Sequence, residues 1–313
     1  MSERKEKPVR IATRGSRLAL WQTHFVAEKL RHAGFAVEIE IINTKGDMVL
    51  DRSLDKIGAK GVFTEELEES LRAGTTDIAV HSAKDLQSVL PEDLEILAFM
   101  EREAVNDVVV SFDSTFSLDR EQIVVGTSST RRRALLQRYY PNVIAAECRG
   151  NLQTRLQKLK DGQYDAILLA YAGVHRMQYN HLVTQMLPAT KFVPAAGQGS
   201  IAIECAKNLE INRKLAIKTC LDHEETHLCL LAERAFLKTM EGGCSIPSFA
   251  LATLSGEVIT ITGGVVSLDG QEMVTDTLQA PAIDAALLGA KLGQQILQMG
   301  GEEILAEIRK HRS

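Results

Sequence analysis

Short runs of β-branched residues alternate with amphipathic helical patterns through the first two thirds of the chain. This βαβ alternation predicts mostly parallel sheets with helices packed on their faces. The pattern starts again after residue 100, which predicts two domains of this kind. Strands are expected at residues 9–13, 36–43, 77–82, 121–129, 142–151 and 165–170, and helices at residues 17–34, 63–74, 130–140 and 152–162.

The last third of the chain has a different pattern, with a helix, three alternating strands and a closing helix. The first helix is expected over residues 222–240, with Asp222 as its N-cap and Glu225 as the capping-box partner. Gly242 and Gly243 are expected to form its left-handed C-terminal turn. The pattern predicts a small α+β domain, with strands at residues 249–254, 257–267 and 272–280 and the closing helix at 281–299.

Composition indicates a soluble globular protein, since 45% of the 313 residues are hydrophobic and 25% are charged. No apolar run is long enough to span a bilayer, and the charged start "MSERKEKPVR" lacks the apolar segment of a secretory signal. Five cysteines without regular spacing argue against a disulfide framework, so we expect a cytoplasmic protein. The net charge of −5 argues against general affinity for nucleic acid.

Arginine, lysine and hydroxyl side chains follow the predicted strands at their carboxyl ends. Open α/β sheets bind ligands at this edge, where helix N-termini also direct free N–H groups. Arginine adds a bidentate fork that suits a carboxylate or a phosphate. The sequence predicts an anion site from Arg14, Ser16, His81, Ser82, Lys84, Thr127, Ser128, Ser129, Arg131, Arg132, Arg149, Asn151 and Arg155.

Positive charge is concentrated between Thr127 and Lys160, where eight basic residues and one acid give +7 in a chain of net charge −5. Some of these residues, such as Arg138, fit an ordinary solvated helix face. The segment "TRRRALLQRYY" also resembles a nucleic-acid element with stacking tyrosines, but it lacks the context of a recognition helix. The pattern favours a ligand with many carboxylates, bound by residues of two domains.

The segment "HEETH", His223 to His227, formally matches the zinc-protease pattern H-E-x-x-H. That pattern needs a helix buried against a cleft and a third ligand. Here the first histidine and the glutamate fall in the first turn of a helix, and no further histidine follows at the required spacing. We therefore expect no metal site.

Cys244 and Asp85 are difficult to explain as packing residues. Cys244, in "MEGGCSIP", lies in a turn, whereas the other four cysteines lie in apolar stretches. A helix C-terminus disfavours thiolate, which argues against a turnover nucleophile at this position. Asp85 follows Lys84 in a region rich in cations, where it either pairs with lysine or faces a positive charge that develops during a reaction.

Seven motifs, in order along the chain, resemble the porphobilinogen deaminase family, also called hydroxymethylbilane synthases. They are "RIATRGSRLALWQ", "KIGAKGVFTEELEESL", "DIAVHSAKDL", "VGTSSTRRRALL", "RGNLQTRLQKL", "AAGQGSIAIEC" and "EGGC". The match is dense to about residue 245 and weaker beyond it. The chain departs from the family pattern at Gly15, Arg17 and Ala83 and after Cys244, without losing a charged or attached group.

The resemblance implies an enzyme that condenses four porphobilinogen molecules head to tail into hydroxymethylbilane, with release of ammonia at each step. It implies a dipyrromethane cofactor, joined to Cys244 by a thioether, and an essential aspartate at Asp85. It also implies a monomer without nucleic-acid or membrane partners, whose product passes to uroporphyrinogen-III synthase. Cofactor contacts are implied for Lys84, Ser129, Arg131, Arg132 and Arg155, and substrate contacts for Arg14, Ser16, Gln22, Arg149, Arg176 and Gln198.

The implied fold is two α/β domains like those of type II periplasmic binding proteins, plus a small C-terminal α+β domain that carries the cysteine. Domain 1 would comprise residues 1–100 and 201–220, domain 2 residues 101–200, and domain 3 residues 221–313. The glycine-rich stretch at about residues 43–62 would form a mobile loop over the site, with Lys56 and Lys60 in it.

The implied substrate fits the predicted anion site, because each porphobilinogen ring brings an acetate and a propionate. Loss of ammonia leaves a methylene-pyrrolenine cation, and we expect Asp85 to accept pyrrole N–H groups and to stabilise that cation. The alternative is a non-catalytic organic-anion-binding protein on the same two-domain scaffold. That alternative explains the arginines but gives no role to Asp85 or to a cysteine in a turn.

Overall fold

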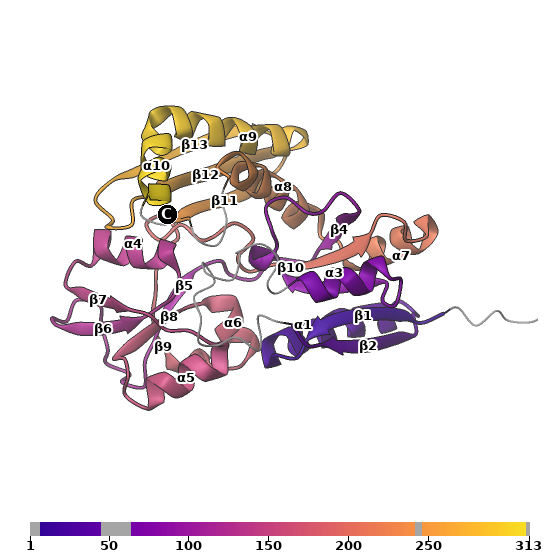
Figure 1. Cartoon of the computed structure of the whole chain (residues 1–313), viewed down its shortest axis with the longest axis horizontal. Coiled ribbons are helices and arrows are strands. Elements are labelled where there is room, and N and C mark those ends of the chain that lie inside the picture. Colours follow the sequence, from indigo (N-terminus) through magenta and orange to yellow (C-terminus); the bar gives the residue numbers. More distant parts are fainter. Residues whose placement is uncertain (1–6, 45–63, 242–245, 311–313) are drawn as a thin grey trace, which may run out of the picture. The chain divides into compact units, whose positions relative to one another are not determined.

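The structure is a computed structural model of the chain, and it describes residues 7–44, 64–241 and 246–310 (Figure 1). The chain forms two compact units, each assembled from separate stretches of sequence. The first unit comprises Met1–Arg102 and Ser200–His227, and the second comprises Glu103–Gly199 and Leu228–Ser313. No helix within the described ranges is long and apolar enough to cross a membrane. The three-domain division expected from the sequence stays a prediction.

The first unit is built on a mixed sheet. Its strands are β1 (Val9–Arg14), β2 (Val37–Ile42), β3 (Ile78–Ser82), β4 (Leu94–Phe99) and β10 (Ile201–Ala206), and its helices are α1 (Arg17–His32), α3 (Glu65–Arg72) and α7 (Ile211–Leu221). The sheet order is β2-β1-β3-β10-β4, in which β10 runs antiparallel to both neighbours. Successive side chains of a strand point to opposite faces, so Ile11 packs with α1 and α7 while Ala12 packs with α3.

The second unit contains a sheet of the same design (Figure 1). Its strands are β5 (Asp107–Val110), β6 (Ile123–Gly126), β7 (Val143–Ala146), β8 (Ala166–Ala170) and β9 (Val183–Met186), and its helices are α4 (Thr130–Tyr139), α5 (Leu152–Lys160) and α6 (Tyr171–Arg176). The order is β7-β6-β8-β5-β9, with β5 antiparallel to both neighbours. One face packs against α4 through Leu135 and Leu136, and the other packs against α5 through Leu156 and Leu159.

The C-terminal part of the second unit adds an antiparallel sheet. It contains strands β11 (Ser248–Ser255), β12 (Val258–Val266) and β13 (Met273–Pro281), with helices α9 (Ala285–Ile296) and α10 (Glu302–Lys310) and the part of helix α8 (Glu224–Thr239) from Leu228 onward. Phe249 and Val266 from this sheet pack into the same core as helix α4. Helices α8 and α9 approach closely, because a Cβ atom added to Gly289 would lie 1.9 Å from Ala232 O.

The expected fold class is confirmed. Two α/β sheets are followed by a small α+β part. The pattern did not reveal β4, β5, β9 or β10, because their short apolar runs lack an alternation that distinguishes a strand from a buried helix segment. The expected closing helix at residues 281–299 is wrong in its limits: β13 extends to Pro281, and α9 is separated from α10 by Gly300 at φ 110°.

The expected N-cap of helix α8 is also wrong by one residue. The helix begins at Glu224, and the Thr226 N–H donates to Nδ1 of His223 at 3.3 Å. Asp222 is occupied elsewhere, because its carboxylate accepts from the Phe99 N–H at 2.8 Å and from Lys218 Nζ at 2.7 Å. At the other end of the helix, Glu241 adopts the left-handed conformation at φ 48°. The expected turn residues Gly242 and Gly243 lie outside the described residues.

Candidate functional site

The carboxyl ends of β1 and β3 lie side by side, because the two strands pair in parallel. Arg14 ends β1, and Ser16 caps α1 by accepting from the Ala19 N–H at 3.3 Å. Gln22 is buried in α1 and donates its side-chain amide to Ser82 Oγ, at the end of β3, at 3.0 Å. The structure thus brings these predicted residues of the first unit to one edge of its sheet.

Asp85 closes the short 3-10 turn Ala83–Asp85 that follows β3. The backbone of this turn is fixed, because the Ala83 N–H donates to Ser200 O at 3.0 Å and the next side chain, Leu86, is 4% exposed. The Asp85 carboxylate is exposed, and it forms no hydrogen bond or ion pair with any other described residue. Lys84 lies half-buried beside it. The turn therefore presents a carboxylate, on a fixed backbone, to an approaching cation or N–H donor.

The second unit places predicted residues at the carboxyl ends of three neighbouring strands, β7, β6 and β8. Ser129 caps α4 by accepting from the Arg132 N–H at 3.4 Å. Asn151 caps α5 by accepting from the Thr154 N–H at 2.9 Å. Arg176 ends α6, the helix that follows β8. Capped helix N-termini and guanidinium groups are therefore gathered at this edge.

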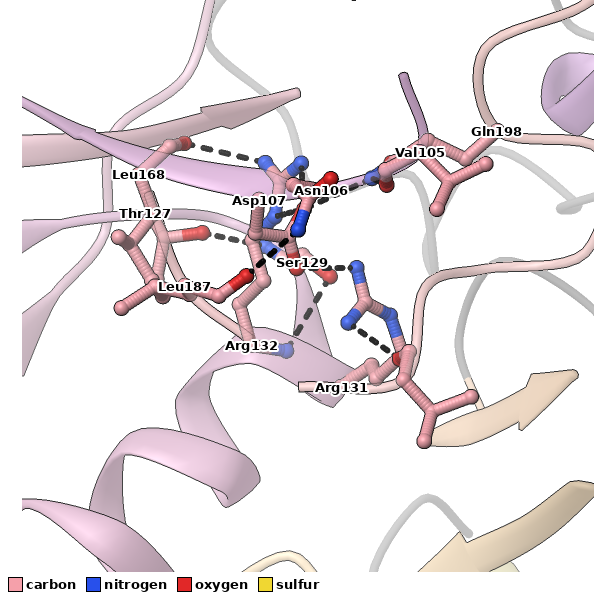
Figure 2. A network of polar contacts seen from close by, with 11 residues as sticks. Val105, Asn106, Asp107, Thr127, Ser129, Arg131, Arg132, Leu168, Leu187 and Gln198 are labelled. Atoms are coloured by element: carbon pink, nitrogen blue, oxygen red, sulfur yellow. Dashed lines mark hydrogen bonds and ion pairs between the residues drawn. The ribbon is translucent and has the colours of Figure 1, made fainter. Parts of the chain in front are cut away.

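A buried carboxylate that the sequence pattern did not single out holds Arg131 and Arg132 (Figure 2). Asp107 Oδ2 accepts from Arg131 Nη2 at 2.8 Å, and Asp107 Oδ1 accepts from Arg132 Nε at 3.0 Å and Nη2 at 2.7 Å. Gln198 Nε2 donates to the same Oδ1 at 2.9 Å. The available signal was an acid directly in front of a valine run, "DVVV", at the start of a buried strand.

Backbone carbonyl groups also accept hydrogen bonds from the two arginines. Arg131 Nη1 donates to Val193 O at 2.9 Å, and Arg132 Nη1 donates to Leu168 O at 3.0 Å. Both side chains are almost fully buried, at 5% and 6% exposure, and the Asp107 side chain is at 0%. The three charged groups therefore form a buried cluster of ion pairs.

The cluster of Asp107, Arg131 and Arg132 carries one net positive charge, because two guanidinium groups face one carboxylate. Burial raises the pKa of Asp107, but the charges of Arg131 and Arg132 more than offset this and hold the pKa well below its ordinary value. Burial lowers the pKa of Arg131, and Asp107 opposes that shift. An excess of positive charge in a buried setting favours an anionic partner nearby.

Two further predicted arginines lie near the start of α5. Arg149 forms an ion pair with Glu147, with Nη2 2.5 Å from Oε1. Arg155 Nε donates to Gly150 O at 2.8 Å. Both side chains are only partly buried, so they remain within reach of a ligand at the surface of this edge.

Arg176 lies in a more enclosed setting than Arg149 and Arg155. Its Nη2 donates to Gly199 O at 2.7 Å. Burial lowers the pKa of Arg176 to about 10, and the charge of Glu103 opposes this. The group stays cationic at neutral pH, so it can still attract a carboxylate.

Three predicted residues lie outside the described residues: Cys244, Lys56 and Lys60. In sequence, Cys244 falls between α8, which ends at Thr239, and β11, which begins at Ser248. The attachment of a group to Cys244 and the part played by the two lysines stay predictions.

The histidines of "HEETH" are engaged in local hydrogen bonds. His227 Nδ1 lies 2.8 Å from Asp222 Oδ1, and His223 Nδ1 lies 2.9 Å from Thr226 Oγ1. Among the described residues, no group of three or more His, Cys, Asp or Glu side chains is arranged to hold a metal ion. The geometry gives the segment a structural role at the start of α8.

Comparison with known proteins matches two family models to nearly the whole chain. The model described as "Porphobilinogen deaminase, dipyromethane cofactor binding domain" matches residues 9–214, and "Porphobilinogen deaminase, C-terminal domain" matches residues 227–298. The chain belongs to the porphobilinogen deaminase family. The sequence resemblance is therefore confirmed, and so is a family domain that binds a dipyrromethane cofactor. Homologues named as deaminases also make the chain a member of an enzyme family.

Porphobilinogen deaminases of several bacteria align with nearly the whole chain. That of Cytophaga hutchinsonii is 52% identical and covers 97% of this chain and 98% of its own length. That of Desulfosudis oleivorans is 49% identical and covers 97% and 99%. Solved structures are more distant: a periplasmic VFT2 domain of Bordetella pertussis BvgS matches at 17% identity and a TM-score of 0.42, covering 68% of this chain and 85% of that one.

Proposed function

We propose that this chain catalyses the porphobilinogen deaminase reaction, in which four porphobilinogen molecules are joined head to tail into hydroxymethylbilane with loss of ammonia at each step. The observation that carries the proposal is the exposed Asp85 carboxylate, held on a fixed turn one strand away from Arg14 and Ser16. Membership of the porphobilinogen deaminase family supports the same activity.

The second unit has a donor set that suits a dipyrromethane, whose two rings bear four carboxylates. The cluster around Asp107 has an excess positive charge, and capped helix N-termini lie at the same sheet edge. Attached through Cys244, the group would supply the free pyrrole carbon to which the first substrate is joined. Cofactor carboxylates would be held by Ser129, Arg131, Arg132 and Arg155, with Lys84 in the first unit.

Asp85 would act on the positive charge that the reaction creates. Loss of ammonia from the aminomethyl group leaves the substrate as a cation, and a fixed carboxylate stabilises such a charge without having to reorganise. The same carboxylate accepts hydrogen bonds from pyrrole N–H groups, which would orient the ring. The fixed backbone of the 3-10 turn is what places the carboxylate for both tasks.

Substrate carboxylates would be bound by Arg14 and Ser16 in the first unit and by Arg149 and Arg176 in the second. Gln22 and Gln198 are at most 2% exposed. We therefore propose that Gln22 acts by holding Ser82, and that Gln198 acts by holding the Asp107 cluster. Lys56 and Lys60 are proposed to work from the loop at about residues 43–62.

The non-catalytic anion-binding alternative explains the arginines equally well. It gives no role to an exposed Asp85 on a fixed turn or to the cofactor-binding domain that defines the family. The enzyme is therefore the better account.

Intact-mass measurement tests the cofactor and its attachment point directly. The purified protein should be heavier than its sequence by two pyrrole units, and Cys244→Ser should remove that increment together with turnover. Cys220→Ser is the control, because the structure shows Cys220 as a free, half-buried cysteine. A fully active protein with the mass of the bare chain would contradict the cofactor assignment.

We further propose that the enzyme works as a monomer in the cytoplasm and passes its product to uroporphyrinogen-III synthase. The cysteines within the described ranges are free, which suits a reducing compartment. Light scattering at micromolar concentration would test the monomer: a mass near 34.4 kDa is expected, and a stable dimer would contradict it.

A further inference from the structure

A tight turn around Gln198 brings its side chain to the cluster of Asp107, Arg131 and Arg132 (Figure 2). The turn has two residues with left-handed backbone, Gly197 at φ 78° and Gly199 at φ 95°. Gln198 Nε2 donates to Asp107 Oδ1 at 2.9 Å and to Val105 O at 2.7 Å. Because one nitrogen makes both bonds, the position of the turn decides whether the amide reaches the Asp107 carboxylate.

A second buried carboxylate, from helix α8, fixes this turn. Glu233 is fully buried, and its Oε2 accepts from the Gly197 N–H at 2.7 Å. Its Oε1 accepts from the Ala252 N–H of β11 at 2.8 Å. Both oxygens act as acceptors of backbone N–H groups, which a carboxylate can do and an amide side chain cannot. Burying a charge is costly unless it is bonded in this way, so an ordinary packing role would be filled better by an apolar residue.

We propose that Glu233 is a positioning residue, which holds the turn so that Gln198 completes the bonding of Asp107 and thereby orients Arg131 and Arg132. The contacts run from Glu233 to the turn, from the turn to Asp107, and from Asp107 to both guanidinium groups, all within the second unit. The inference rests on the proposed function, because it takes the arginine pair to bind cofactor or substrate carboxylates.

The same residue also bonds to β11, the strand that follows the predicted attachment point in sequence. Helix α8, which contains Glu233, ends at Thr239, and β11, which contains Ala252, begins at Ser248. Cys244 lies in sequence between these two ends. Glu233 therefore fixes, through one carboxylate, the turn beside the cluster and the strand that follows the attachment segment.

The substitution Glu233→Gln tests the proposal, because it keeps the size of the side chain but places an NH2 group against one of the two backbone N–H groups. Hydrogen exchange at the Gly197 amide should become faster. Per cofactor-loaded enzyme, kcat/KM should fall by about tenfold, in the range of measured couplings between contacting residues. The matched control is Glu225→Gln, an exposed glutamate in the first turn of the same helix, which should leave both quantities unchanged.

A double-mutant cycle with Gln198→Leu separates positioning from a general loss of stability. If Glu233 acts through Gln198, then Glu233→Gln should cost little further kcat/KM in the Gln198→Leu background. Losses that multiply independently, or a Glu233→Gln protein with parental kcat/KM and parental exchange at Gly197, would overturn the proposal.

Failure of the proposed function would look different in these measurements. A parent protein with no pyrrole mass increment and no turnover of porphobilinogen would contradict the proposed enzymatic function. The exchange of the Gly197 amide needs neither substrate nor cofactor turnover, so it would still report whether Glu233 holds the turn.

Discussion

Replacing Asp107 with asparagine should strongly destabilise the second unit. The substitution keeps the shape of the side chain but removes the only carboxylate that the described structure places against Arg131 and Arg132. An asparagine oxygen at the position of Oδ1 would keep the bonds from Arg132 and Gln198. Its NH2 group would then face Arg131 Nη2, which in the parent protein donates to Asp107 Oδ2 at 2.8 Å.

The size of the effect follows from this geometry. Removing one partner of a buried ion pair costs about 3–5 kcal/mol, because a charge is left without compensation. The lost bond between Arg131 and Asp107 contributes about 1.5–3 kcal/mol of this, and repulsion between the two guanidinium groups contributes the rest. For a unit of this size the melting temperature should fall by roughly 6–20 °C.

Thermal unfolding at neutral pH, followed by circular dichroism, measures this loss, with the exposed Asp284→Asn as the control. The pKa of Asp107 is lowered by folding, so its stabilisation is fully present above the unfolded pKa of about 4 and is lost as the pH falls towards the lower folded pKa. The stability gap between parent and variant should therefore shrink below about pH 4. A gap under about 1 kcal/mol at neutral pH, or one that widens in acid, would refute the reasoning.

Substitutions at three other positions have defined outcomes. Asp85→Glu keeps the charge but moves it, so kcat should fall on the order of 100-fold. The kcat of Asp85→Ala should fall further. Turnover of either variant at the parental rate would exclude the role of Asp85. Burial raises the pKa of Asp222, but bonds from His227 and Lys218 bring the pKa down to about 2. Asp222→Asn should therefore lose on the order of 2 kcal/mol in urea unfolding at neutral pH and roughly half of that near pH 3, whereas equal losses at both would contradict this. Gly289→Ala should push α8 and α9 apart and cost about 1–3 kcal/mol or more by the same assay; an unchanged midpoint would contradict the close contact.

The alternation of apolar runs was enough to predict the α/β sheets, and the residues after the strands identified their carboxyl edges. That part succeeds because the position of a side chain after a strand is a local property of the sequence. Ser16, Ser129 and Asn151 illustrate it, since each lies between a strand and a helix and each caps that helix.

Partners that meet across the fold could not be predicted in the same way. Asp107 and Gln198 are 91 positions apart, and Glu233 and Gly197 are 36 apart. Nothing in the local pattern around Glu233, within "LLAERAFL", distinguishes a buried acid from a solvated one. Pairing of this kind follows from the path of the chain through the fold. Strands β5 and β10, which run antiparallel to their neighbours in the two α/β sheets, were among the strands that the pattern did not reveal.

The strand order of the first unit also constrains how the protein is made. Strand β10 lies between β3 and β4 and pairs with both, yet it begins at Ile201, whereas β4 ends at Phe99. A ribosome adds roughly 5–20 residues per second, so the intervening stretch of about 100 residues takes roughly 5–20 seconds to synthesise. During that time the emerging N-terminal strands have open hydrogen-bonding edges on either side of the position that β10 will fill. The nascent chain must therefore be protected from edge-to-edge association until strand β10 leaves the ribosome.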